Sequence, residues 1–164
     1  MLKVILRTFC VLATAGSPLA AAEAGGERIA GRWQGQSYAG DSSGPLTLDI
    51  VACGQSWCGI RVAANDACGG TALKIDSGIA EAGSEYIQFK GTLELAPGTE
   101  PYVVQTSLFV PAPDSPSGAA LTLQITGDTG GEFRAYRRSF PFEAQMVRIK
   151  DAVCHAPQTV SSLR

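Results

Sequence analysis

The chain has 164 residues, 17% of them charged, and a formal net charge of −2. This length suits one domain that buries its core without help from a metal or a partner. The weak negative charge argues against nucleic acid or an anionic membrane as partner, because both are bound by basic surfaces.

The first 24 residues have the pattern of a Sec-type export signal. Lys3 and Arg7 give a positive start, a short apolar run follows, and small residues offer cleavage sites near Ala22 or Ala24. The apolar run is too short to span a bilayer, so we do not expect an integral membrane protein. The sequence therefore predicts a signal peptide over 1–24 and a periplasmic or secreted single domain over 25–164.

Apolar and polar residues alternate along most of this domain, which is the period of half-buried β-strands. One long irregular stretch is expected at about 64–84, and turns rich in glycine, proline and aspartate separate the other segments. Clear or partial alternation predicts eight strands, at 30–38, 46–52, 58–63, 87–95, 102–110, 121–126, 132–138 and 142–146.

Eight short strands with short connections are expected to pair antiparallel and to close into a barrel, or to split into a β-sandwich. Gly31-Arg32-Trp33 opens the first strand, and Arg148 lies in the last strand in phase with Phe142 and Met146. These residues resemble the lipocalin–calycin barrels. The resemblance implies a single all-β, antiparallel, eight-stranded lipocalin-like β-barrel in which Arg148 stacks over Trp33 and closes one end.

Cleavage of the signal leaves four cysteines, an even number that indicates two disulfides in an oxidising compartment. We predict the pairs Cys53–Cys58 and Cys68–Cys154, although four cysteines allow three pairings. The alternative is a zinc site that includes His155, but the spacing lacks the paired C-x2-C of structural zinc sites. We therefore expect no metal and no cofactor.

The short disulfide meets one objection. A two-residue turn at Gln55-Ser56 sets Cys53 opposite Cys58, but we expect the same hairpin to pair apolar Leu48 with Arg61. The pairing then needs a β-bulge to keep the charged side chain off the core face.

A second resemblance concerns the front of the domain. It is carried over about 35 residues by Trp33, Leu48-Asp49-Ile50, Cys53-Gly54 and Cys58-Gly59-Ile60. These residues are similar to the opening of the domain of unknown function 2147 family of exported bacterial proteins. That family has no assigned activity, so the resemblance implies a bacterial periplasmic location and no site residues.

Two segments are similar to protease motifs, and neither predicts catalysis. The stretch from Gly40 to Leu46 is similar to the nucleophile loop of trypsin-like proteases, but the only histidine, His155, follows Ser42 instead of preceding it. Asp128-Thr129-Gly130 is similar to the aspartic-protease triplet but lacks the apolar residues that seat that loop. We expect no catalytic residues and a protein that is not an enzyme.

Two sets of side chains are candidates for contacts. Arg134, Tyr136 and Arg138 share one face of a predicted strand, where they either bind an anionic group or form a solvated outer face. Trp57 is expected to be half-exposed and to pack on the short disulfide.

The sequence favours an exported, non-enzymatic binding protein that holds a small apolar or amphiphilic ligand in its barrel. The alternative is a periplasmic protein–protein module, such as a protease inhibitor or an envelope accessory. The opening Ala30-Gly31-Arg32-Trp33 resembles small periplasmic inhibitors of secreted metalloproteases, which implies a binding arm at 25–29. A filled interior favours the module, and a lined cavity favours the carrier.

Overall fold

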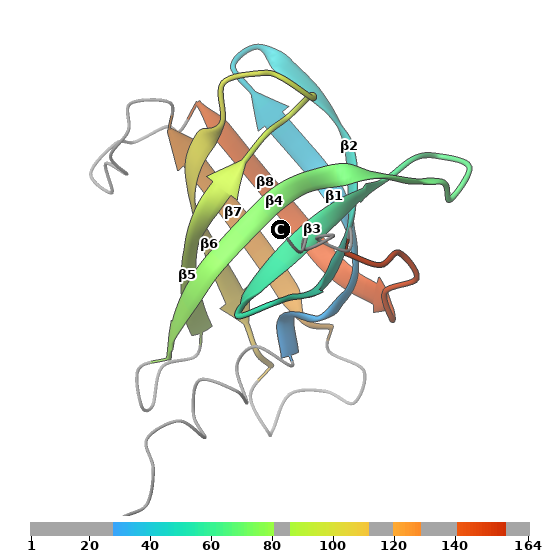
Figure 1. The fold of residues 1–164 in the computed structure, drawn as a ribbon. Coiled ribbons are helices and arrows are strands. Elements are labelled where there is room, and N and C mark those ends of the chain that lie inside the picture. Colours follow the sequence, from blue (N-terminus) through green and yellow to red (C-terminus); the bar gives the residue numbers. More distant parts are fainter. Residues whose placement is uncertain (1–27, 81–85, 112–119, 129–140, 157–164) are drawn as a thin grey trace, which may run out of the picture.

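The computed structural model describes residues 28–80, 86–111, 120–128 and 141–156, which form a closed barrel of eight antiparallel strands (Figure 1). The strands are β1 (Gly31–Ala39), β2 (Ser42–Cys53), β3 (Ser56–Val62), β4 (Cys68–Ala80), β5 (Tyr86–Leu93), β6 (Tyr102–Phe109), β7 (Thr122–Asp128) and β8 (Phe142–Lys150). Each strand pairs with the next, and β8 pairs back with β1. The predicted all-β barrel is confirmed, and the β-sandwich alternative is wrong.

The strand that sequence reasoning missed is β4. The stretch 64–84 was expected to be irregular, yet 13 of its residues form one of the longest strands of the barrel. Leu73 and Ile75 are fully buried while Lys74 and Asp76 are exposed, so the alternation is present but short. Glycines on both sides of this run conceal it, because glycine is depleted in strands.

The predicted signal peptide, the strand at 132–138 and most of the proposed arm lie outside the described residues. The barrel closes without the segment 132–138, because β7 pairs directly with β8 from Thr122 opposite Val147 to Gly127 opposite Phe142. No helix within the described residues has the length and apolar character needed to cross a membrane.

Both predicted disulfides are present. Cys53 and Cys58 are bonded with Cα atoms 5.8 Å apart, and Cys68 and Cys154 with Cα atoms 5.7 Å apart. Two such bonds agree with an oxidising, extracytoplasmic environment. They also rule out these four cysteines as thiolate ligands of a metal.

The turn between β2 and β3 differs from the prediction. Its two residues are Gly54 and Gln55, and Gly54 takes a positive φ of 71° that favours glycine. Leu48 does pair with Arg61, and no bulge separates them. Arg61 stays half-buried and donates from Nη2 to the carbonyl oxygen of Glu94 at 2.9 Å, so a hydrogen bond accommodates the charge instead.

The interior of the barrel is occupied by one cluster of apolar side chains. Strands β1, β2 and β4 to β8 contribute residues that are at most 2% exposed, among them Trp33, Leu48, Ile50, Leu73, Ile75, Phe89, Leu93, Val104, Leu108, Leu123, Ile125, Phe142, Ala144 and Met146. Successive residues of a strand face opposite sides, so every second residue reaches this cluster.

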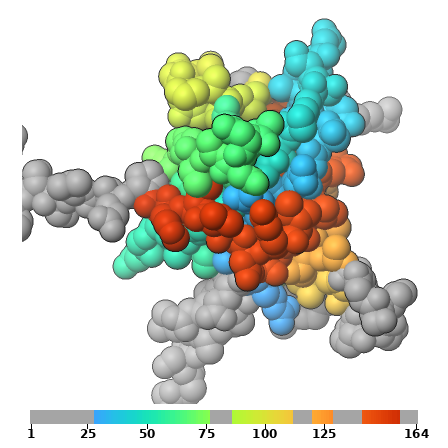
Figure 2. Space-filling view, turned by 90° about the vertical axis from the view of Figure 1, so that its right-hand side faces the viewer, coloured from blue at the N-terminus to red at the C-terminus, as the bar shows by residue number. Residues whose placement is uncertain are grey.

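A second, smaller cluster lies on the outer face of the barrel. Cys58, Ile60 and Val62 alternate with the inward-facing residues of β3, and Cys154 covers them from the segment that follows β8. Figure 2 shows the C-terminal residues (red) lying against the residues near β4 (green). The C-terminal segment therefore acts as a cover for an apolar strip that β3 presents outward.

The pairing of β1 with β8 closes the barrel, and Gly35 permits it. A Cβ atom at this position would lie 1.8 Å from the carbonyl oxygen of Gln145 on β8. Only a residue without a side chain lets the two backbones approach to hydrogen-bonding distance here.

We expect Gly35→Ala to lower the free energy of unfolding by about 1–3 kcal/mol or more, because the new methyl group forces β8 away from β1. Gly44→Ala is the matched control, since a Cβ at Gly44 on the neighbouring strand meets no atom within 4 Å. Urea denaturation followed by far-UV circular dichroism measures both. Equal midpoints for the two variants would show that the closure tolerates a side chain.

Candidate functional site

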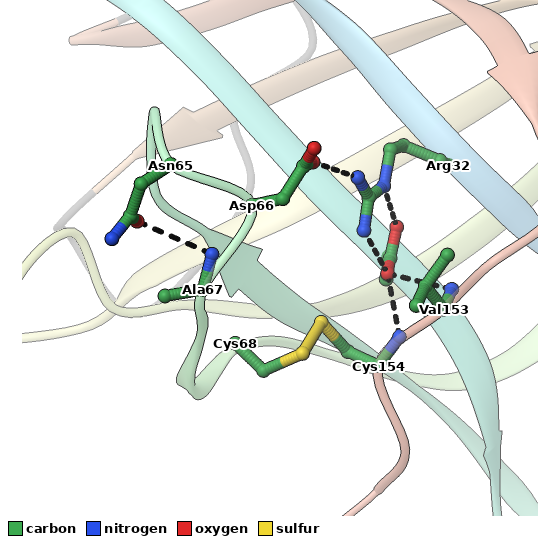
Figure 3. Close-up of a disulfide and its surroundings, with 8 residues drawn as sticks. Arg32, Asn65, Asp66, Ala67, Cys68, Val153 and Cys154 are labelled. Carbon is green, nitrogen blue, oxygen red and sulfur yellow. Dashed lines mark hydrogen bonds and ion pairs between the residues drawn. A yellow bond between two sulfur atoms is a disulfide. The ribbon is translucent and has the colours of Figure 1, made fainter.

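A buried ion pair lies on the outer face of β1 and β2. The guanidinium of Arg32 donates to both carboxylate oxygens of Asp49, from Nε at 2.6 Å and from Nη2 at 2.9 Å (Figure 3). Arg32 is 2% exposed and Asp49 is 0% exposed. Arg32 also forms an ion pair with Asp66, whose side chain is largely exposed.

The same carboxylate holds the C-terminal segment. Asp49 Oδ2 accepts hydrogen bonds from the backbone N–H groups of Val153 at 2.9 Å and Cys154 at 2.7 Å. Cys154 is bonded to Cys68, so an ion pair and a disulfide fix the segment at the same place (Figure 3). The C-terminal segment that Asp49 holds in place therefore also covers the ion pair.

Burial raises the pKa of Asp49, but hydrogen bonds from Arg32, Cys154 and Val153 outweigh it and hold that pKa below its ordinary value. The hydrogen bond to Asp49 in turn raises the pKa of Arg32, against the opposing effect of burial. Both groups are therefore ionised at neutral pH, and each satisfies the charge of the other.

The residues predicted to close the barrel lie opposite each other. Trp33 on β1 is the direct partner of Arg148 on β8, next to a register shift between Arg32 and Trp33. Trp33 is fully buried and its Nε1 donates to the carbonyl oxygen of Ile29 at 2.7 Å.

Arg148 is about one third exposed, and it donates from Nε to the carbonyl oxygen of Ala30 at 3.0 Å and from Nη2 to Asp151 at 2.8 Å. The bond to Ala30 ties β8 to the residues that precede β1, and the bond to Asp151 stays within the segment that follows β8. The two residues pair with each other across β1 and β8, and the closure of one barrel end by stacking of guanidinium on indole stays a prediction.

The structure does not bring the protease-like residues together. Ser42 pairs with Ala39 at one end of β1. His155 is exposed and follows β8, and the last residue of β8, Lys150, pairs with Arg32 at the opposite end of β1. Asp128 is buried at the end of β7, opposite Val103.

Other candidate residues stand as follows. Arg134, Tyr136 and Arg138 lie outside the described residues, so their role in binding an anion stays a prediction. Trp57 is half-buried, but it packs against the interior cluster and not against the short disulfide, because it shares the inward face of β3 with Gly59. Within the described residues, no three His, Cys, Asp or Glu side chains gather closely enough to hold a metal ion.

Among the described residues, one polar side-chain atom inside the barrel has no hydrogen-bond partner. Thr106 lies in the middle of β6 between Phe89 on β5 and Ile125 on β7, and it is fully buried. Its hydroxyl forms no hydrogen bond to any described residue. Burial of an unpaired hydroxyl costs free energy, so this group is the feature of the interior most suited to contact a bound molecule.

A depression formed by described residues lies on the outer surface of the barrel. It is a groove of about 680 Å³ across β1, β8, β7 and the end of β6. Its walls include Gln34, Gln36, Tyr38, Phe109, Gln124 and Gln145. The volume falls within the range of small-molecule sites, about 300–1,000 Å³.

No protein-family model, no curated protein and no solved structure matches this chain. The fold and the site geometry therefore carry the functional argument by themselves. The likeness to the domain of unknown function 2147 family stays a prediction.

The low pKa of Asp49 predicts an acid-sensitive fold. Its contribution to stability is present above the pKa of the unfolded chain, near 3.8, and is lost as the pH falls through the lower folded value. We expect the free energy of unfolding, measured by urea titration, to fall below about pH 4. In Asp49→Asn, which has no carboxylate at this position to protonate, we expect the contribution of residue 49 to this loss of stability to disappear.

At neutral pH, Asp49→Asn is expected to cost about 3–5 kcal/mol, because Arg32 keeps a buried charge without its main counterion. Asp66→Asn is the control: its exposed carboxylate contributes less than about 1 kcal/mol. Equal losses for the two variants, or an unchanged acid response in Asp49→Asn, would contradict the assignment.

Proposed function

We propose that the chain is an exported, non-enzymatic binding module that engages its partner through its outer surface. The observation that carries this proposal is the filled interior, where apolar side chains from seven strands form one cluster whose members are at most 9% exposed. An eight-stranded barrel has just enough width for side chains to fill it or for one small ligand. Here apolar side chains take that space, while a groove formed by described residues opens on the outside.

A carrier of small apolar ligands is the second candidate, and one observation favours it. The unpaired hydroxyl of Thr106 is placed where a ligand inside the barrel would need a polar contact. A ligand there would have to displace part of the buried cluster. A carrier function therefore requires the buried cluster to rearrange and open a cavity, whereas binding on the outer surface requires no change in the barrel.

The substitution Thr106→Val tests whether this hydroxyl is unpaired in the ligand-free protein, which the carrier candidate requires. If the hydroxyl is simply unpaired, its removal stabilises the fold by about 1 kcal/mol, because the desolvation cost disappears. Thr92→Val is the control, since Thr92 is exposed on the outer face of β5 and is expected to be neutral. Urea denaturation measures both variants.

Native mass spectrometry of the full chain, expressed with its leader and recovered from its own periplasm, completes the test. We expect no small apolar molecule bound to the wild-type protein. A molecule that co-purifies with the wild type and is lost from Thr106→Val would establish the carrier instead.

A further inference from the structure

The outer groove contains an ordered row of side-chain amides. The strand register places Gln36 on β1 directly opposite Gln145 on β8, and Gln145 directly opposite Gln124 on β7. Ser107 on β6 and Gln88 on β5 continue the row at the same level. Because neighbouring strands lie about 4.8 Å apart, the three amides of the groove span roughly 10 Å, and the hydroxyl of Ser107 and the amide of Gln88, beyond the groove lining, extend the polar row to roughly 20 Å.

A carboxylate fixes the orientation of two of these amides. Glu143 Oε1 accepts hydrogen bonds from Gln124 Nε2 at 3.3 Å and from Gln145 Nε2 at 3.2 Å. A carboxylate only accepts, so both amide nitrogens face Glu143 and both amide oxygens face away from it. Each amide keeps an acceptor oxygen and a further N–H donor for a ligand, and less side-chain entropy is lost on binding.

Aromatic side chains flank the amide row. Tyr38 lies on β1 on one side of the row and is 53% exposed; Phe109 ends β6 on the other side and is 38% exposed. Phe109 contacts Tyr86 on β5 with ring centroids 5.7 Å apart. Flat apolar surface therefore stands next to hydrogen-bonding groups on both sides of the groove.

None of the described residues that line the groove carries a charge. A solvated outer face normally carries interspersed charges of both signs, because these charges keep the protein soluble and prevent association with other molecules. Glu143, which holds two of the lining glutamines, adds a negative charge beside the groove, and the described lining offers phosphate or carboxylate ligands no cationic group. The matching ligand is neutral, offers many groups that both donate and accept, and has apolar faces.

We propose that the groove binds a neutral glycan. Sugar hydroxyls donate and accept as the glutamine amides do, and the C–H faces of pyranose rings pack on tyrosine and phenylalanine rings. An extended β-1,4-linked glycan repeats at close to the spacing of neighbouring strands, so successive sugars can follow successive amides. This inference rests on the proposed binding through the outer surface and names the site and the ligand class.

Isothermal titration with neutral hexasaccharides, one of β-1,4-linked glucose and one of β-1,4-linked N-acetylglucosamine, tests the proposal. We expect one of them to bind the full-length mature protein with little dependence on salt, because no ion pair forms. A hexasaccharide of uronic acids is expected not to bind. The double variant Gln124→Ala/Gln145→Ala should weaken binding at least ~10-fold, since it removes two oriented amides.

Gln105→Ala is the matched control, because Gln105 lies on the outer face of β6 outside the groove lining. It should leave the affinity unchanged, and Tyr38→Ala should weaken it. All four substituted residues are at least partly exposed, so circular dichroism is expected to show the wild-type fold.

Failure of both neutral glycans to bind, or equal affinity in the wild type and the double variant, would overturn the glycan assignment. If the double variant instead loses a protein that co-purifies with the wild type, the occupant is a protein. The glycan inference then fails and binding through the outer surface stands. A bound molecule inside the barrel would remove both.

Discussion

The pairing of β1 with β8 is the constraint on which the rest of the structure depends. Without it, eight strands form an open sheet with two unpaired edges, and the interior cluster loses one wall. Gly35 makes the pairing possible because a side chain there would meet the backbone of β8. The same closure brings Gln36 next to Gln145, so the groove exists only in the closed barrel.

The ion pair of Arg32 and Asp49 stabilises this closure from outside. A buried ion pair is not in itself a strong source of stability, because desolvation of both charges offsets much of their attraction. Here the carboxylate has a further use, since it also accepts from the backbone of the C-terminal segment. We attribute to it the positioning of that segment over the outer face of β3.

The sequence predicted the features that depend on local pattern. Alternation in segments such as 121–126 identified strands, and the even number of cysteines indicated two disulfides, both correctly paired. The strand β4 was missed because its clear alternation spans only Leu73 to Asp76, between glycines. The pairing of Leu48 with Arg61 was taken as a clash because the carbonyl that binds Arg61 comes from Glu94, 33 residues away.

The row of glutamines in the groove could not be predicted from the sequence, because it depends on the register of the strands. Gln36, Gln124 and Gln145 come from distant parts of the chain, and each alone is a typical outward residue of a strand. Only the strand order and the register place them in one row. Arg32 was noticed only as the middle residue of Gly31-Arg32-Trp33, because nothing local indicates that Cys154 and its neighbours cover it.

The positions of the cysteines suit a chain that enters an oxidising compartment with its N-terminus first. Beyond the predicted signal, which holds Cys10, the first two thiols to emerge are Cys53 and Cys58, which lie five residues apart and are native partners. Cys68 then has no correct partner until Cys154 arrives, 86 residues later and after all eight strands. Oxidation in order of emergence thus yields the native connectivity without reshuffling, and fastening of the C-terminus becomes the final covalent step of maturation.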